Sequence, residues 1–268
     1  MAVSIPIIDV SPLAARDTAG TERVASEIGA ACWETGFFYV AGHDVPNELM
    51  QAAFERSAAF FAQEDQKKRE VIYDASSNRG YVPMKGEALD PSKPADLKKA
   101  FNIGLELPAD DPEMVEGAMF RAANLWPDTA GFRDTMLAYF SACHDLGRAL
   151  HRAFAIDLGL ETGFFEDKLD RPMAVLRLLH YPAAEGPSEA GQLGAGEHTD
   201  YGCVTLLATD GVGGLEVRTR AGEWIAAPHV PGTFVCNIGD CLMRWTNDIY
   251  VSTPHRVVSP SGRERFSI

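Results

Sequence analysis

The feature that most constrains the fold is a change in the pattern of residues after Pro172. From there on, short apolar runs alternate with glycine and proline at close spacing, which is typical of strands joined by turns. Many short strands at such spacing indicate a β-sandwich, a barrel or a jelly roll. The predicted strands are Ala174–Tyr181, Gly202–Ala208, Gly214–Arg218, Trp224–Ala226, Thr233–Ile238, His255–Val258 and Arg265–Ile268.

Residues up to about 170 have a mainly helical pattern. Apolar residues recur at helical spacing in three places, which predicts helices that end near Gly36, begin at Pro46 and follow Pro127. A buried strand is expected at 37–40, and the segment 75–94, rich in glycine and proline, is expected to be an irregular loop of lid-like length. The predicted core stripe of the longest helix is Met136, Phe140, Cys143, Gly147, Leu150 and Phe154.

These two parts predict one α+β structural unit of 268 residues, with a helical region at 1–170 and a β region at 171–268. The 24 basic against 38 acidic residues give a formal charge of −14. Such a surface repels phosphate backbones and anionic lipids, so we expect no nucleic-acid partner and no membrane partner. The five cysteines are an odd number without a C-x-x-C pair, which favours a reducing, cytoplasmic location.

Two histidines and an aspartate form a candidate metal site. His198 and Asp200 are two residues apart at the start of a predicted strand, so their side chains share one face. His255 enters another short strand 55 residues after Asp200. Two histidines and one carboxylate are the ligand set of non-heme Fe(II) oxygenases. Taken alone, the H-x-D pattern also fits a core histidine hydrogen-bonded to a carboxylate.

An arginine and a serine form a candidate anion site. Arg265 follows His255 by ten residues, and Ser267 shares its face of the predicted strand. A guanidinium and a hydroxyl together suit a terminal carboxylate. The alternative is an ordinary surface arginine near the chain end.

Taken together, these motifs resemble the iron- and 2-oxoglutarate-dependent dioxygenases of the isopenicillin N synthase-like family, and the resemblance runs along the whole chain. Segments in the first half are similar to its bacterial members, and four segments in the second half match its core. The segments are Ile5–Asp9, Gly36–Val40, Asn78–Tyr81 and Asp96–Phe101, then Leu178–Pro182, His198–Gly202, Asn237–Asp240 and Ser252–His255.

The resemblance implies a double-stranded β-helix (jelly roll) flanked by N-terminal helices. It also implies that His198, Asp200 and His255 bind Fe(II). Arg265 and Ser267 would then hold the distal carboxylate of 2-oxoglutarate, with a hydroxyl from Tyr181. The implied reaction couples oxidative decarboxylation of 2-oxoglutarate by O2 to hydroxylation, or a related oxidation, of a small organic molecule.

The substrate residues are predicted by analogy of position. They are Arg79, Tyr81, Lys85, Phe101 and Arg177. Their basic character predicts a carboxylate-bearing substrate, although Arg79 and Lys85 also fit solvated lid charges. By strand alternation, Arg177 and Leu179 share the face of Tyr181, while His180 points away and is expected to be structural.

Two alternatives lie within this family: an ethylene- and succinate-forming 2-oxoglutarate dioxygenase, and an enzyme that uses no 2-oxo acid. Outside it stands a metal-free or zinc-bound, non-catalytic jelly-roll binding module. The chain stops at Ile268, inside the strand that carries Arg265 and Ser267. We therefore expect a truncated C-terminus that weakens this site, in a protein that is a monomer or a weak oligomer.

Overall fold

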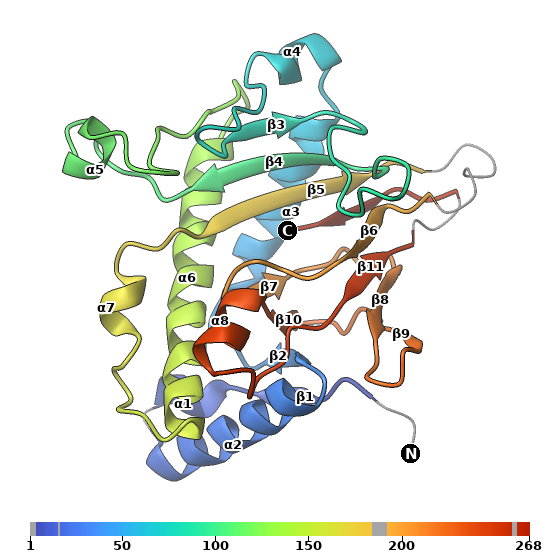
Figure 1. Ribbon diagram of the computed structural model, residues 1–268. Coiled ribbons are helices and arrows are strands. Elements are labelled where there is room, and N and C mark those ends of the chain that lie inside the picture. The colour runs from blue at the N-terminus through green and yellow to red at the C-terminus, as the bar shows by residue number, and fades with distance from the viewer. Residues whose placement is uncertain (1–3, 16, 184–191, 259–261) are drawn as a thin grey trace.

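The computed structural model describes residues 4–15, 17–183, 192–258 and 262–268. These residues form eight helices and twelve strands (Figure 1). The helices are α1 (Ser11–Ala15), α2 (Thr18–Glu34), α3 (Asn47–Phe61), α4 (Asp65–Arg69), α5 (Pro112–Val115), α6 (Phe132–Asp157), α7 (Glu166–Leu169) and α8 (Asp240–Trp245). No helix within the described ranges combines the length and the apolar character that a membrane span requires.

The strands belong to one long sheet and one short sheet. They are β1 (Ile7–Asp9), β2 (Phe37–Ala41), β3 (Gly80–Val82), β4 (Lys99–Gly104), β5 (Val175–Tyr181), β6 (Ala195–His198), β7 (Val204–Leu207), β8 (Leu215–Arg218), β9 (Trp224–Ala226), β10 (Phe234–Ile238), β11 (His255–Val257) and β12 (Arg265–Ser267). The ladders β1-β2-β10-β7 and β12-β5-β4-β3 meet at an antiparallel bridge between Thr209 and Ser267. The long sheet therefore runs from β1 to β3.

The short sheet has the order β6-β11-β8-β9. An apolar core lies between it and the long sheet, and both sheets supply its residues. The long sheet contributes Tyr39, Tyr181 and Val235, for example, and the short sheet contributes Val217 and Val257. Two mostly antiparallel sheets around one core form the jelly roll that the sequence predicts, so the α+β prediction is confirmed.

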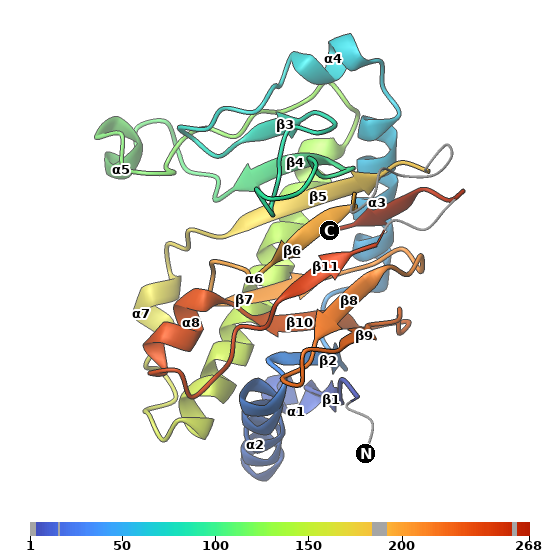
Figure 2. The same ribbon diagram turned by 45° about the vertical axis from the view of Figure 1, so that its right-hand side comes forward.

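The three long helices cover the other face of the long sheet, and in Figures 1 and 2 α3 and α6 pass behind its strands. A second and larger core fills the space between helices and sheet, with Ile28 of α2, Phe60 of α3 and Phe154 of α6 fully buried. The predicted stripe of α6 is confirmed at Met136, Leu150 and Phe154, which are also fully buried.

The first half contains more strand than its pattern suggests. Residues 80–82 form β3 within the segment expected to be an irregular loop, and β4 follows at 99–104. Both join the long sheet beside β5. The local pattern hides β4 because charged residues precede it, and those charges are neutralised by residues distant in the chain.

The last strand is paired on both sides. β12 runs antiparallel to β5, and the backbones of Ala208 and Ile268 exchange hydrogen bonds of 2.9 and 3.1 Å on its other side. Arg265 and Ser267 are each 1% exposed. Both therefore lie inside the fold, within the long sheet.

Candidate active site

Three potential metal ligands meet at one end of the short sheet. His198 ends β6, His255 begins β11, and the two face each other directly across the ladder. The Nε2 atoms of both histidines lie 3.7 Å from Oδ1 of Asp200. One ligand atom from each residue lies within 4.8 Å of the other two, a separation at which all three could bind the same metal ion.

Hydrogen bonds to the backbone orient both imidazole rings. Nδ1 of His198 lies 2.7 Å from the carbonyl oxygen of Gly196, and Nδ1 of His255 lies 3.1 Å from that of Thr253. A carbonyl can only accept, so each Nδ1 carries the proton and donates. Nε2 therefore keeps its lone pair, which is the usual arrangement of a metal-binding histidine.

The carboxylate of Asp200 is held by its second oxygen. Oδ2 accepts hydrogen bonds from Thr205 Oγ1 (2.6 Å) and Asn237 Nδ2 (2.8 Å). Burial opposes ionisation, but the neighbouring His255 and these two donors more than offset it, so the pKa of Asp200 is lowered. The carboxylate therefore stays ionised, with Oδ1 facing the two histidines.

Burial also favours the neutral form of His198. Its pKa is lowered mainly by burial and next by the neighbouring His255. Metal binding requires a neutral imidazole, so the environment prepares this side chain as a ligand.

A second cluster lies where β5 and β12 pair. Arg265 is directly opposite Tyr181 in this ladder, and its guanidinium carbon is 4.8 Å from the centre of the tyrosine ring. Nη1 of Arg265 donates to Ser267 Oγ at 3.3 Å, and Nε donates to the carbonyl of Val212 at 3.3 Å. The predicted residues Arg265, Ser267 and Tyr181 are therefore brought together.

The guanidinium of Arg265 has no carboxylate partner within the described ranges. A buried cation is costly unless an anion compensates it. Tyr181 belongs to the core between the sheets, as do Ala195 of β6 and Val257 of β11, which flank the three metal-binding candidates. The anion-binding and metal-binding candidates therefore line the same interior space, which fits a carboxylate-bearing co-substrate.

Among the predicted substrate residues, only Arg177 reaches this side of the long sheet. It shares the face of Tyr181 and Leu179, and its guanidinium pairs with Glu87. His180, one residue from Tyr181, points the other way and stacks on Phe266 at 4.6 Å, as strand alternation predicts. Lys85 is exposed on the segment between β3 and β4.

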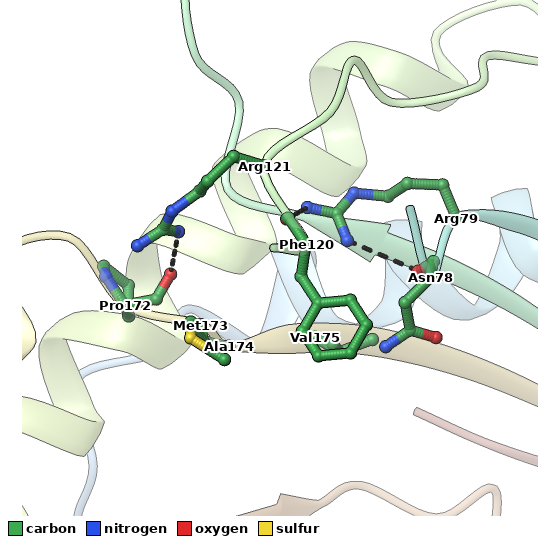
Figure 3. A pocket seen from close by; sticks show the side chains of 8 residues that line it. All are labelled: Asn78, Arg79, Phe120, Arg121, Pro172, Met173, Ala174 and Val175. Carbon is green, nitrogen blue, oxygen red and sulfur yellow. Dashed lines mark hydrogen bonds between the residues drawn. The ribbon is translucent and has the colours of Figure 1, made fainter. Parts of the chain in front are cut away.

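Arg79 lies apart from the metal-binding candidates. It lines a small pocket beside the start of β5 (Figure 3), where its guanidinium donates to the carbonyls of Ser77, Asn78 and Phe120. These bonds hold the segment around Phe120 against the start of β3. The contacts of Arg79 are therefore structural, and none supports its predicted substrate role.

Tyr81 and Phe101 face the helices. Both are fully buried, and both rings pack edge-on against Phe60 of α3. Burial raises the pKa of Tyr81 to about 12, so its hydroxyl stays protonated. Strand alternation explains the difference, because both side chains point to the opposite face of the sheet from Arg177. No contact in the structure supports a substrate role for either.

Sequence reasoning did not assign a role to several residues around the site. Thr205 and Asn237 hold Asp200, and Asp96, Lys98 and Glu87 form a charged group next to β6. A signal was present, because Asp96 and Lys98 are two residues apart and two charges on one face of an apolar strand need partners.

Comparison with known proteins agrees with this geometry. Residues 5–129 match the family described as "non-haem dioxygenase in morphine synthesis N-terminal", and residues 172–268 match the 2OG-Fe(II) oxygenase superfamily. The 2-oxoglutarate-Fe(II) type oxidoreductase hxnY of Emericella nidulans is 36% identical over 270 residues, which cover 98% of this chain and 77% of the relative. A homoarginine-6-hydroxylase of Glycine max is 37% identical over 280 residues, covering 99% and 84%.

Solved structures show the same architecture. The full-length Neurospora crassa protein in complex with alpha-KG and thymine has a TM-score of 0.85 and 35% identity, covering 98% of this chain and 83% of that one. A 2OG-Fe(II) oxygenase family protein from Caulobacter crescentus also has a TM-score of 0.85, with 32% identity and coverage of 99% and 86%.

The fold, the paired site and these matches define a non-heme iron oxygenase. The chain belongs to the 2OG-Fe(II) oxygenase superfamily, as a dioxygenase of the isopenicillin N synthase-like family. It is an enzyme that uses Fe(II), 2-oxoglutarate and O2 to oxidise a small molecule, and not a non-catalytic binding module. Its place in a bacterial branch stays a prediction.

Proposed function

We propose that His198, Asp200 and His255 are the Fe(II) ligands. The observation that carries this proposal is the orientation of the three side chains. Both Nε2 atoms and Oδ1 of Asp200 face one another, while Nδ1 of each histidine and Oδ2 of Asp200 are engaged by the protein. Three ligands on one side leave positions open for a chelating co-substrate and O2.

Arg265, Ser267 and Tyr181 are proposed to hold the distal carboxylate of 2-oxoglutarate. When bound, Fe(II), 2-oxoglutarate and O2 supply an oxidative decarboxylation to succinate and CO2, which drives oxidation of a substrate C–H bond. The protein fixes the ligand atoms, neutralises the co-substrate with Arg265 and surrounds both with the apolar core between the sheets. That core limits access of water to the reacting groups.

The proposed prime substrate is a small molecule with a carboxylate, bound by Arg177. The guanidinium is on the inner face of β5, its side chain is 33% exposed, and its buried Nε has no hydrogen-bond partner among the described residues. Glu87 occupies the guanidinium, so an incoming carboxylate would replace Glu87. The printed names of relatives refer to small molecules such as homoarginine and thymine.

We further propose that 1–170 and 171–268 form one structural unit. The interleaved long sheet supports this, since β2 lies between β1 and β10, and β4 pairs with β5. A monomer or weak oligomer in the cytoplasm is proposed on the basis of five unpaired cysteine thiols, which suit a reducing compartment.

Alanine variants test the proposed metal ligands. His198→Ala, Asp200→Ala and His255→Ala should each abolish succinate formation from 2-oxoglutarate and lower the bound iron, with the helical signal in circular dichroism retained. His229→Ala is the matched control, because this exposed histidine bonds only Thr209 outside the site. Near-normal turnover in His255→Ala would refute the ligand set.

A screen of small carboxylic acids, each beside its primary amide, tests the substrate class. Carboxylates should stimulate succinate release above the uncoupled background, and Arg177→Gln should remove the preference of acid over amide. Stimulation by amides and acids alike would refute the role of Arg177. Ethylene release without any added substrate would identify the ethylene-forming alternative.

A further inference from the structure

Asp96 is a buried carboxylate that the reaction does not use directly. It is 3% exposed and lies on the segment between β3 and β4. Its Oδ1 accepts a hydrogen bond of 2.9 Å from the backbone N–H of Gly196, a residue 100 positions further along the chain. Its Oδ2 accepts from the backbone N–H of Leu89 at 3.2 Å and from Lys98 Nζ at 2.5 Å.

Gly196 is also the residue that orients His198. Its carbonyl accepts the Nδ1–H of His198 at 2.7 Å. A Cβ at position 196 would lie 2.9 Å from the backbone nitrogen of Asp90 and 3.4 Å from Oδ1 of Asp96. The segment therefore packs directly on Gly196, and Asp96 fixes the backbone from which the histidine is held.

Lys98 gives Asp96 a second role. The lysine is 4% exposed, and its ammonium also lies 3.5 Å from Glu87. Its charge is among the smaller causes that lower the pKa of His198, after burial and His255. A cation at this place opposes a metal cation bound to His198, and the carboxylate of Asp96 offsets it.

We propose that Asp96 is a positioning residue of the metal centre, because it holds Gly196 behind His198 and neutralises Lys98 beside it. The inference rests on the proposed role of His198 as a metal ligand. Residues behind a metal ligand commonly change metal affinity about 10- to 100-fold when they are replaced.

Co(II) binding to the metal-free protein, titrated without 2-oxoglutarate or O2, tests this proposal. Asp96→Asn should weaken binding by about 10-fold or more. Asp90→Asn is the matched control, because this carboxylate of the same segment bonds Ser92 instead of β6 and should leave binding unchanged. Wild-type affinity in Asp96→Asn, with His198→Ala defective, would overturn this inference alone. Equal binding by wild type and His198→Ala would instead overturn the proposed ligand set.

The double variant Asp96→Asn/Lys98→Met separates the two roles. Removing the lysine charge should restore most of the lost Co(II) affinity if neutralisation matters, and no restoration would refute that role. A measurement on the unaltered protein guards against misfolded variants. The Gly196 amide should exchange slowly with solvent in the metal-free protein, and fast exchange would show that Asp96 does not hold it.

Discussion

Arg265 is a buried charge for which the site provides neutral neighbours only. Its contacts are a tyrosine ring, the hydroxyl of Ser267 and the carbonyl of Val212. Such a guanidinium is ready for an incoming carboxylate, because the cost of burying the charge has already been met by the fold.

Replacing this residue should therefore affect the co-substrate selectively. Arg265→Gln removes a charge-assisted contact worth about 1.5–3 kcal/mol, or roughly 10- to 150-fold in affinity. The KM for 2-oxoglutarate should rise accordingly, with Co(II) affinity unchanged. Arg244→Gln is the control, because it alters only an exposed ion pair with Asp248. An unchanged KM in Arg265→Gln would point to Arg177 as the anchor.

Among the elements, the turn from α2 into β2 supports the metal site from behind. Gly36 has a φ of +67°, and the next residue, Phe37, packs edge-on against His255 at 5.4 Å. A Cβ at Gly36 would lie 2.2 Å from the carbonyl oxygen of Val251. Both the backbone conformation and the space therefore require glycine.

Gly36→Ala should destabilise the protein more than Gly159→Ala does. Gly159 has the same φ of +67° but open space around it, so its substitution carries only the left-handed backbone cost of about 1–2 kcal/mol. Gly36→Ala adds the clash with Val251. Urea denaturation of both variants measures the difference, and equal losses would show that the contact at Val251 is not limiting.

The elements also show what the sequence can predict. Strand alternation places Arg177, Leu179 and Tyr181 on one face and His180 on the other, because that pattern is local. It does not reveal that Asp96 meets Gly196 or that Tyr81 meets Phe60, since these contacts depend on how distant segments pack. The metal-binding candidates were predictable because their types and spacing are tied to one chemistry. The substrate residues were not, because only analogy of position identified them.

At the scale of the whole molecule, four histidines have lowered pKa values. Burial is the largest cause for His43, His151, His180 and His198, whose ordinary value is 6.5. The unfolded chain therefore binds more protons than the folded chain as the pH falls through 6.5. Stability follows the difference in bound protons, so the folded state loses free energy in this range.

The free energy of unfolding of the metal-free protein should be constant above about pH 7.5 and should fall between pH 7 and pH 5. Urea denaturation at a series of pH values measures it. His229→Gln, which changes an exposed histidine, should leave the slope unchanged. Stability that is flat or rises on acidification would contradict the neutral state of the buried histidines.

The most direct test of the central claim is an anaerobic visible spectrum of the Fe(II)-loaded protein with 2-oxoglutarate. The claim is that His198, Asp200 and His255 hold the iron while Arg265, Ser267 and Tyr181 hold the co-substrate beside it. Wild type should develop a weak charge-transfer band on addition of 2-oxoglutarate, because a 2-oxo acid chelates the iron. Arg265→Gln should need more 2-oxoglutarate for the same band, and His255→Ala should show none. Absence of the band in wild type, or its full persistence in His255→Ala, would contradict the account.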